Sequence, residues 1–125
     1  MIECLFVGAG GFAGAVFRYL MGLIPVFNKS PFPFMTLSIN VIGAFIIGAV
    51  TQLSESYGVF SENELLLLRA GLCGGFTTFS TFALESAGMM EEGKIVYTAI
   101  YAAASVLLCI IAVFAGKYIA GRIMM

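Results

Sequence analysis

The chain has 125 residues, of which 61% are hydrophobic and only 10% are charged, with six Lys or Arg, seven Asp or Glu and no His. Soluble domains carry about 45–50% apolar and about 25% charged residues, so this composition excludes an ordinary soluble domain, a disordered chain and a protein that binds nucleic acid through its charge. It predicts an all-α integral membrane protein, because one helical span takes about 20 residues and the chain is long enough for about four.

Charged and polar segments divide the chain into four apolar stretches. They predict helices at residues 4–27, 33–54, 63–90 and 95–121, within one membrane domain that covers residues 1–125. Long uncharged runs of this kind indicate transmembrane helices. Four spans place both termini on the same side of the membrane.

The first stretch is rich in small residues. Gly10 and Gly14 form a small-xxx-small pair, and Gly71 and Gly75 repeat that spacing in the third stretch. Because helix association in lipid depends on close packing, these pairs predict helix–helix contacts. Four short helices leave little room for a pathway inside one subunit, which favours function at a subunit interface. Positive charge is nearly balanced between the two sides, so an antiparallel homodimer is available.

The second stretch contains a carboxamide in the middle of the span. Asn40 and Thr36 are four residues apart and therefore share one helical face. A polar side chain in hydrocarbon needs a partner. Two interpretations remain open, namely hydrogen bonding between helices and a hydrogen-bond donor that lines a pathway.

The third stretch contains an unusual Gly-Gly-Phe-Thr-Thr sequence at residues 74–78. Glycine is a poor residue for a helix interior, and irregular backbone at membrane depth is tolerated only inside protein or beside an aqueous cavity. The sequence predicts a break in the third helix near Gly74–Thr78. An unwound helix frees carbonyl oxygens that are good ligands for Na⁺, so the segment is a candidate cation site. A simple kink is the alternative.

Two phenylalanines follow the predicted break. Phe79 and Phe82 are three residues apart and share a face, and the positive edges of their rings suit a small anion. Plain packing is the alternative. Further neutral hydrogen-bond donors lie on the same and neighbouring spans, and no acid or base is among them: Thr36, Ser80, Thr81, Tyr101 and Ser105. Such a set suits an anion better than a cation.

Two charged residues lie inside the first and third stretches. Arg18 has three interpretations: it extends to the membrane surface, pairs with Glu85, or draws anions into a vestibule. Glu85 lies near the end of the third stretch, and its simplest interpretation is an interfacial residue.

Three motifs carry a resemblance that covers essentially the whole chain. Residues 11–19 (GFAGAVFRY) are similar to a first-helix Gly-Ala-x-x-Arg-Tyr motif, and residues 36–43 (TLSINVIG) to a second-helix Thr-Leu-x-x-Asn-x-x-Gly motif. Residues 74–82 (GGFTTFSTF) are similar to a broken-helix signature. In this order the motifs resemble those of the Fluc (CrcB) family of fluoride channels.

The resemblance implies a dual-topology antiparallel homodimer in the lipid bilayer, with two fluoride pores along the subunit interface. It implies a structural Na⁺ at the dimer centre, held by the main-chain carbonyls of Gly74 and Thr77. The implied pathway residues are Asn40, Phe79, Phe82, Ser80, Thr81, Tyr101, Ser105 and Thr36. Arg18 and Glu85 match a vestibule arginine and a third-helix glutamate.

Three other functions compete with a passive fluoride channel. A four-helix multidrug exporter needs a membrane-embedded carboxylate in its first helix, where this chain has only the terminal Glu3. A structural subunit of a membrane complex predicts no ion flux. An enzyme is disfavoured, because the chain has no His and no paired carboxylates at active-site spacing.

Overall fold

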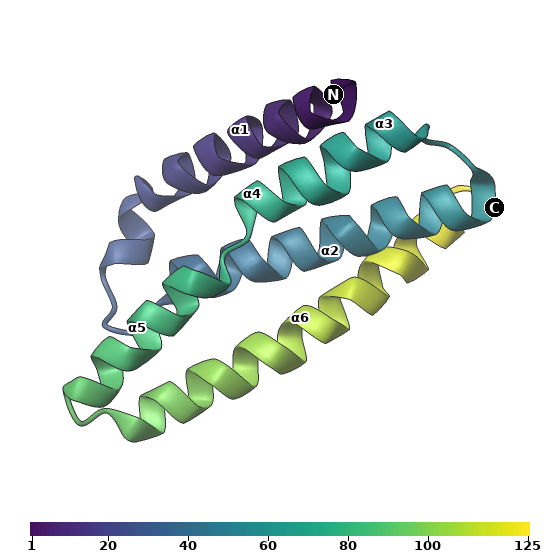
Figure 1. Cartoon of the computed structure of the whole chain (residues 1–125). Coiled ribbons are helices and arrows are strands. Elements are labelled where there is room, and N and C mark those ends of the chain that lie inside the picture. The colour runs from purple at the N-terminus through teal and green to yellow at the C-terminus, as the bar shows by residue number, and fades with distance from the viewer.

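The computed structural model describes residues 1–125, and all of its regular secondary structure is helical. Its elements are α1 (Ile2–Gly22), the 3₁₀ helix η1 (Pro25–Asn28), α2 (Phe34–Tyr57), α3 (Glu62–Leu65), the π-helix η2 (Leu66–Cys73), α4 (Gly74–Phe76), α5 (Phe79–Glu91) and α6 (Ile95–Ile123). The helices run back and forth along one direction, and both termini lie at the same end (Figure 1).

Four helical segments are long and apolar enough to span a membrane: α1, α2, the combined segment Glu62–Glu91, and α6. Only 15 of the 125 residues are buried, and large apolar side chains such as Phe12 and Leu84 are exposed. A soluble monomer rarely presents so much contiguous apolar surface. The chain is therefore a multi-pass membrane protein, as its composition predicts.

The predicted end of the first helix is wrong. α1 ends at Gly22, before the predicted limit of residues 4–27, and the chain then turns into η1. Ile24 is extended (φ −72°, ψ 119°), because a proline disfavours the helical conformation of the residue before it. Pro25 then starts η1, where its fixed φ suits a first turn.

The turn between the second and third spans is shorter than predicted. α2 continues to Tyr57 and ends at Gly58, which adopts the left-handed conformation (φ 59°) that favours glycine. α3 starts at Glu62, four residues after Gly58, with a capping box: the Ser61 side chain accepts from the Glu64 amide at 3.3 Å, and the Glu64 carboxylate accepts from the Ser61 amide at 2.8 Å.

Close contact between α1 and the η2–α4 segment depends on the predicted glycine pairs. A Cβ atom added at Gly10 would collide with the Leu67 carbonyl oxygen, and one added at Gly75 would lie 2.6 Å from the Gly11 carbonyl oxygen. Only glycine lets these two backbones approach so closely. This contact fixes the part of the third span that precedes the break.

The second close pair is formed by α2 and α6, which lie side by side (Figure 1). Gly48 faces the Val113 backbone, and Gly116 faces the Phe45 carbonyl oxygen, in each case without space for a Cβ atom. After the break, α5 leaves α1 and packs against α6 and the start of α2. The break thus lies where the two helix pairs meet.

Candidate functional site at the break in the third span

The third span is interrupted by two extended residues. Thr77 (φ −80°, ψ 157°) and Thr78 (φ −151°, ψ 116°) separate α4 from α5. The two glycines at the start of the predicted break are helical, so the interruption is narrower than residues 74–78. β-Branched threonine is well suited to extended backbone, which places the break after the glycines.

Side-chain hydrogen bonds close both ends of the break. The amide and the hydroxyl of Thr77 both donate to the Cys73 carbonyl, at 3.0 and 2.7 Å. The Thr78 hydroxyl accepts from the Thr81 amide at 3.1 Å and so caps the start of α5. Each threonine therefore satisfies backbone groups that a helix end leaves free.

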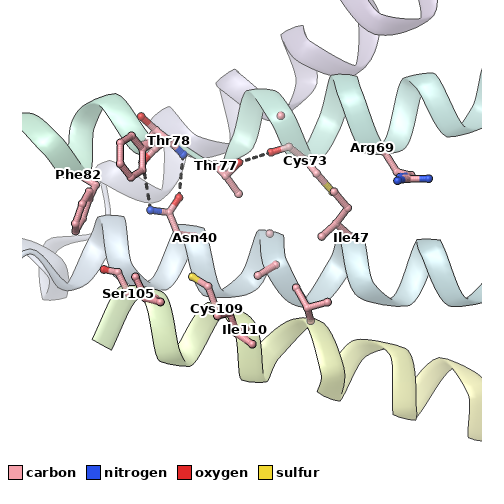
Figure 2. Close-up of a pocket in the computed structure, with 16 residues that line it drawn as sticks. Asn40, Ile47, Arg69, Cys73, Thr77, Thr78, Phe82, Ser105, Cys109 and Ile110 are labelled. Carbon is pink, nitrogen blue, oxygen red and sulfur yellow. Dashed lines mark hydrogen bonds between the residues drawn. The ribbon is translucent and has the colours of Figure 1, made fainter. Parts of the chain in front are cut away.

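Asn40 holds the break from the neighbouring span. Its Oδ1 accepts from the Thr78 amide at 2.9 Å, and its Nδ2 donates to the Thr78 carbonyl at 3.2 Å (Figure 2). One carboxamide thus pairs with both backbone groups of an unwound residue inside the membrane, where an unpaired group is costly. The structure places the predicted donor in contact with the predicted break.

The carboxamide also keeps a free donor. An asparagine NH₂ group has two hydrogens, and the pairing with Thr78 uses one. Asn40 faces a cavity of about 470 Å³. Six of the sequence-predicted site residues line this cavity: Asn40, Gly74, Thr77, Phe79, Phe82 and Ser105.

The cavity wall contains one charged side chain, Arg69, and no carboxylate. Ser105 adds a buried hydroxyl that makes no hydrogen bond within the chain. Figure 2 shows Asn40, Ser105 and Phe82 toward one end of the group of lining residues and Arg69 at the other end. The site therefore offers neutral donors and positive charge, which suits an anion.

The aromatic residues form a connected group. The Phe79 and Phe82 ring centroids are 5.4 Å apart, and Phe82 lies 4.9 Å from the Tyr101 ring. Tyr101 is fully buried and donates to a Glu85 carboxylate oxygen at 2.9 Å. Thr36 is also fully buried, and its hydroxyl has no partner within the chain. Tyr101, Thr36 and Glu85 lie outside the cavity wall.

The two remaining predicted donors surround the Thr78 side chain. The Thr78 hydroxyl is 3.0 Å from the Thr81 hydroxyl and 3.3 Å from the Ser80 hydroxyl. Ser80 and Thr81 are outside the cavity wall in a single copy of the chain. Their polar atoms thus belong to the cap of α5.

Arg18 is tied to the break from the first span. Its Nε donates to the Gly75 carbonyl at 3.1 Å, so the suggested pairing with Glu85 is wrong, because Glu85 is bound by Tyr101 instead. The Arg18 guanidinium thus provides a hydrogen-bond donor for the Gly75 carbonyl, one of the last carbonyls of α4. Gly74 and Thr77, whose carbonyls are the predicted Na⁺ ligands, both line the cavity.

Sequence reasoning missed three contributors to the site. Thr78 is the partner of Asn40, and the Thr78–Thr81 spacing of a helix cap is a signal that could have indicated it. Gly43 lies directly against the Thr77 methyl group, where a Cβ atom would not fit. Arg69 is not among the predicted site residues, and its place in the cavity wall depends on the packing of η2.

Comparison with known proteins gives one consistent result. The sequence model of the family described as CrcB-like protein, Camphor Resistance (CrcB), matches residues 5–117. A protein of Chlorobaculum tepidum named Fluoride-specific ion channel FluC is 43% identical over 120 residues, which cover 96% of this chain and 95% of the relative. A relative of the same name from Ruminiclostridium cellulolyticum is 42% identical over 98% of this chain and 95% of its own length.

An archaeal relative extends the comparison. Fluoride-specific ion channel FluC 1 of Methanosarcina acetivorans is 43% identical over 117 residues, which cover 94% of this chain and 89% of the relative. The similarity therefore includes all four spans and the break. These relatives are named as ion channels, and none of the three names describes an enzyme.

Proposed function

The chain belongs to the CrcB-like protein family, and from this membership we propose that it is a fluoride-selective ion channel of the plasma membrane. It lets F⁻ leave the cell passively and so relieves fluoride toxicity. The observation that carries this proposal is the cavity at the break, which has neutral donors, one cation and no carboxylate. Neutral donors replace part of the water shell of a small anion and still release it, as conduction requires.

The ring edges of Phe79 and Phe82 complete the proposed pathway. Both rings line the cavity, and an aromatic edge carries partial positive charge that attracts an anion weakly. The free N–H of Asn40 and the hydroxyl of Ser105 act as donors beside them. The other predicted pathway residues lie beside the cavity: the Ser80 and Thr81 hydroxyls surround the Thr78 cap, the Tyr101 hydroxyl is bound to Glu85, and the Thr36 hydroxyl has no partner within the chain.

We propose that the channel is an antiparallel homodimer of two chains with opposite membrane orientation. Phe79, Val106 and Ile110 line the cavity, yet they are 78%, 57% and 52% exposed in a single chain. A pathway wall that is open on one side needs a second surface. A second copy supplies it, and the weak charge bias of the chain permits both orientations.

A structural Na⁺ fits the donors present at the break. The chain has no cluster of three or more His, Cys, Asp or Glu side chains that could hold a metal ion. The main-chain carbonyls of Gly74 and Thr77 are hard oxygen donors near the C-terminal end of α4, where the helix dipole is negative. A second copy would supply the matching pair. When bound, Na⁺ supplies positive charge that holds the two unwound segments together.

Sodium is expected to stabilise the folded dimer. A ligand that binds only the folded state at about 100 times its dissociation constant adds about 2.7 kcal/mol. Thermal unfolding in detergent should therefore occur at higher temperature in NaCl than in the same concentration of N-methyl-D-glucamine chloride. Equal midpoints in the two salts would rule out the Na⁺ site, whether or not the protein conducts fluoride.

Two alternatives predict different results. A multidrug-type exporter needs an embedded carboxylate in its first helix, but Glu3 is 59% exposed and paired with the N-terminal amine at 2.9 Å. A structural membrane subunit conducts no ion. Neither alternative matches the relatives, all of which are named as fluoride channels.

Fluoride efflux from liposomes that contain only this protein tests the proposed function. With a fluoride electrode, we expect efflux far above that of protein-free liposomes, and chloride efflux close to that background. The matched control carries Phe79→Ile and Phe82→Ile, which keep apolar side chains but remove both ring edges, and it should lose fluoride efflux. The proposal would be falsified by fluoride efflux from liposomes with wild-type protein that is no faster than efflux from protein-free liposomes.

A further inference from the structure

A second hollow region lies at the membrane end opposite to the termini. It has a volume of about 390 Å³ and lies between the η1–α2 connection and the end of α5. Its wall includes Phe32, Glu85 and Lys94. Lys94 is paired with Glu92 at 3.0 Å. The lining of this outer pocket is more polar than that of the cavity at the break, and it includes three charged residues, Glu85, Glu92 and Lys94.

A buried layer separates the outer pocket from the cavity at the break. Tyr101 and Thr36 are both 0% exposed, and neither lines either hollow region. Each lies one helical turn from a residue of the cavity wall, namely Ser105 on α6 and Asn40 on α2. Because Thr36 and Tyr101 belong to the proposed fluoride path, that path crosses this layer between the outer pocket and the cavity.

Tyr101 contacts both sides of the layer. On the cavity side the Phe82 ring lies 4.9 Å away. On the pocket side the Phe32 ring lies 5.5 Å away, in an edge-to-face arrangement with an interplanar angle of 75°. Its hydroxyl is bound to Glu85 in the wall of the outer pocket. A continuous line of rings thus leads from the membrane surface to Phe79 at the break.

Phe32 differs from the other three aromatic residues in the type of backbone segment that carries it. Phe79, Phe82 and Tyr101 are on membrane helices, whereas Phe32 lies in the non-helical segment between η1 and α2. Local hydrogen bonds fix its backbone: its amide donates to the Ser30 hydroxyl at 3.2 Å, and its carbonyl accepts from the Phe34 amide at 2.8 Å. The ring is therefore positioned by a short, tightly hydrogen-bonded turn.

We propose that Phe32 is a selectivity-determining residue of the conduction pathway, an inference that rests on the proposed fluoride channel. Its ring lies in the wall of the outer pocket and packs edge-to-face with Tyr101, and a ring edge turned toward the proposed path would attract an anion weakly. A small anion passes a constriction by edge contacts in place of water, whereas a larger anion needs a wider opening. The chain thus discriminates between halides at the surface of the protein as well as at Phe79 and Phe82.

The test compares chloride and fluoride efflux from liposomes that contain wild-type protein, Phe32→Ala or Phe32→Tyr. We expect Phe32→Ala to raise the ratio of chloride to fluoride efflux roughly two- to tenfold, the range that corresponds to the loss of one aromatic contact. Phe32→Tyr retains the ring and should keep the wild-type ratio. A general loss of structure would lower both fluxes together and leave no selective gain in chloride.

The matched control is Phe34→Ala. The Phe34 ring lies 4.7 Å from Phe32 and is 48% exposed, but it makes no ring contact with Tyr101. The ratio of chloride to fluoride efflux from the Phe34→Ala variant should remain at the wild-type value. If Phe32→Ala does not yield folded protein, Phe32→Leu removes the ring but keeps most of the apolar volume, and the same shift is expected.

Each result has a distinct meaning. A wild-type protein that conducts fluoride, together with an unchanged ratio in a folded Phe32 variant without the ring, overturns the role of Phe32 and leaves the proposed function intact. An equal shift in Phe34→Ala also overturns it, because the effect would then come from the packing of the turn. Wild-type protein without fluoride flux overturns both proposals.

Discussion

Replacing Asn40 with leucine is expected to abolish fluoride efflux and to destabilise the folded protein. Leucine has a similar size but no polar atoms, so the N–H and C=O groups of Thr78 lose the partner that they share. A buried polar group left without a partner costs about 1–3 kcal/mol, so the two groups together cost about 2–6 kcal/mol. Liposome efflux measures the first effect, and thermal unfolding in detergent measures the second.

Asn40→Asp separates the conduction role from the folding role. A carboxylate still accepts from the Thr78 amide, and a protonated carboxyl group pairs with both Thr78 groups, but neither form has a second N–H for the cavity. We therefore expect a smaller loss of stability than in Asn40→Leu and an equally severe loss of efflux. Asn63→Leu, in the first turn of α3 far from the cavity, should conduct normally. Wild-type efflux from either Asn40 variant would contradict the assigned role.

The sequence alone predicts the membrane class, the number of spans and the close helix contacts. These properties depend on local composition and on spacing, which the chain displays directly. The pairs Gly10/Gly14 and Gly71/Gly75 meet as expected, because a glycine pair on a helix face is useful only where another backbone comes close. The end of α1 was misplaced because the apolar residues up to Phe27 hide the effect of Pro25 on the backbone.

The site itself is less predictable from the sequence. The motif around Asn40 indicates a polar residue at membrane depth, but it does not reveal that the side chain pairs with Thr78 in another span. The glycines of the broken-helix segment suggest a longer break, yet Gly74 and Gly75 remain helical, and α1 packs directly against Gly75. Arg18 also bonds to Gly75. Such contacts depend on tertiary packing, which overrides local propensity.

A bulky substitution at Gly14 is expected to have the second large effect. A Cβ atom at this position would collide with the Leu72 carbonyl oxygen and lie 2.7 Å from the Phe76 amide nitrogen. These are backbone atoms, so Gly14→Val forces α1 away from η2 and α4. Overpacking of this kind typically costs about 1–3 kcal/mol. The displacement would also separate Arg18 from the Gly75 carbonyl.

Gly8→Val is the matched control for this prediction. Gly8 is on the same helix, and a Cβ atom there meets nothing within 4 Å. Both variants make the same change in helix propensity, so the difference between their thermal unfolding midpoints isolates the contact at Gly14. We expect Gly14→Val to unfold at a clearly lower temperature and to lose efflux, because α1 holds the α4 segment whose end forms the break. Equal midpoints for the two variants would mean that the close contact at Gly14 does not hold α1 against η2 and α4.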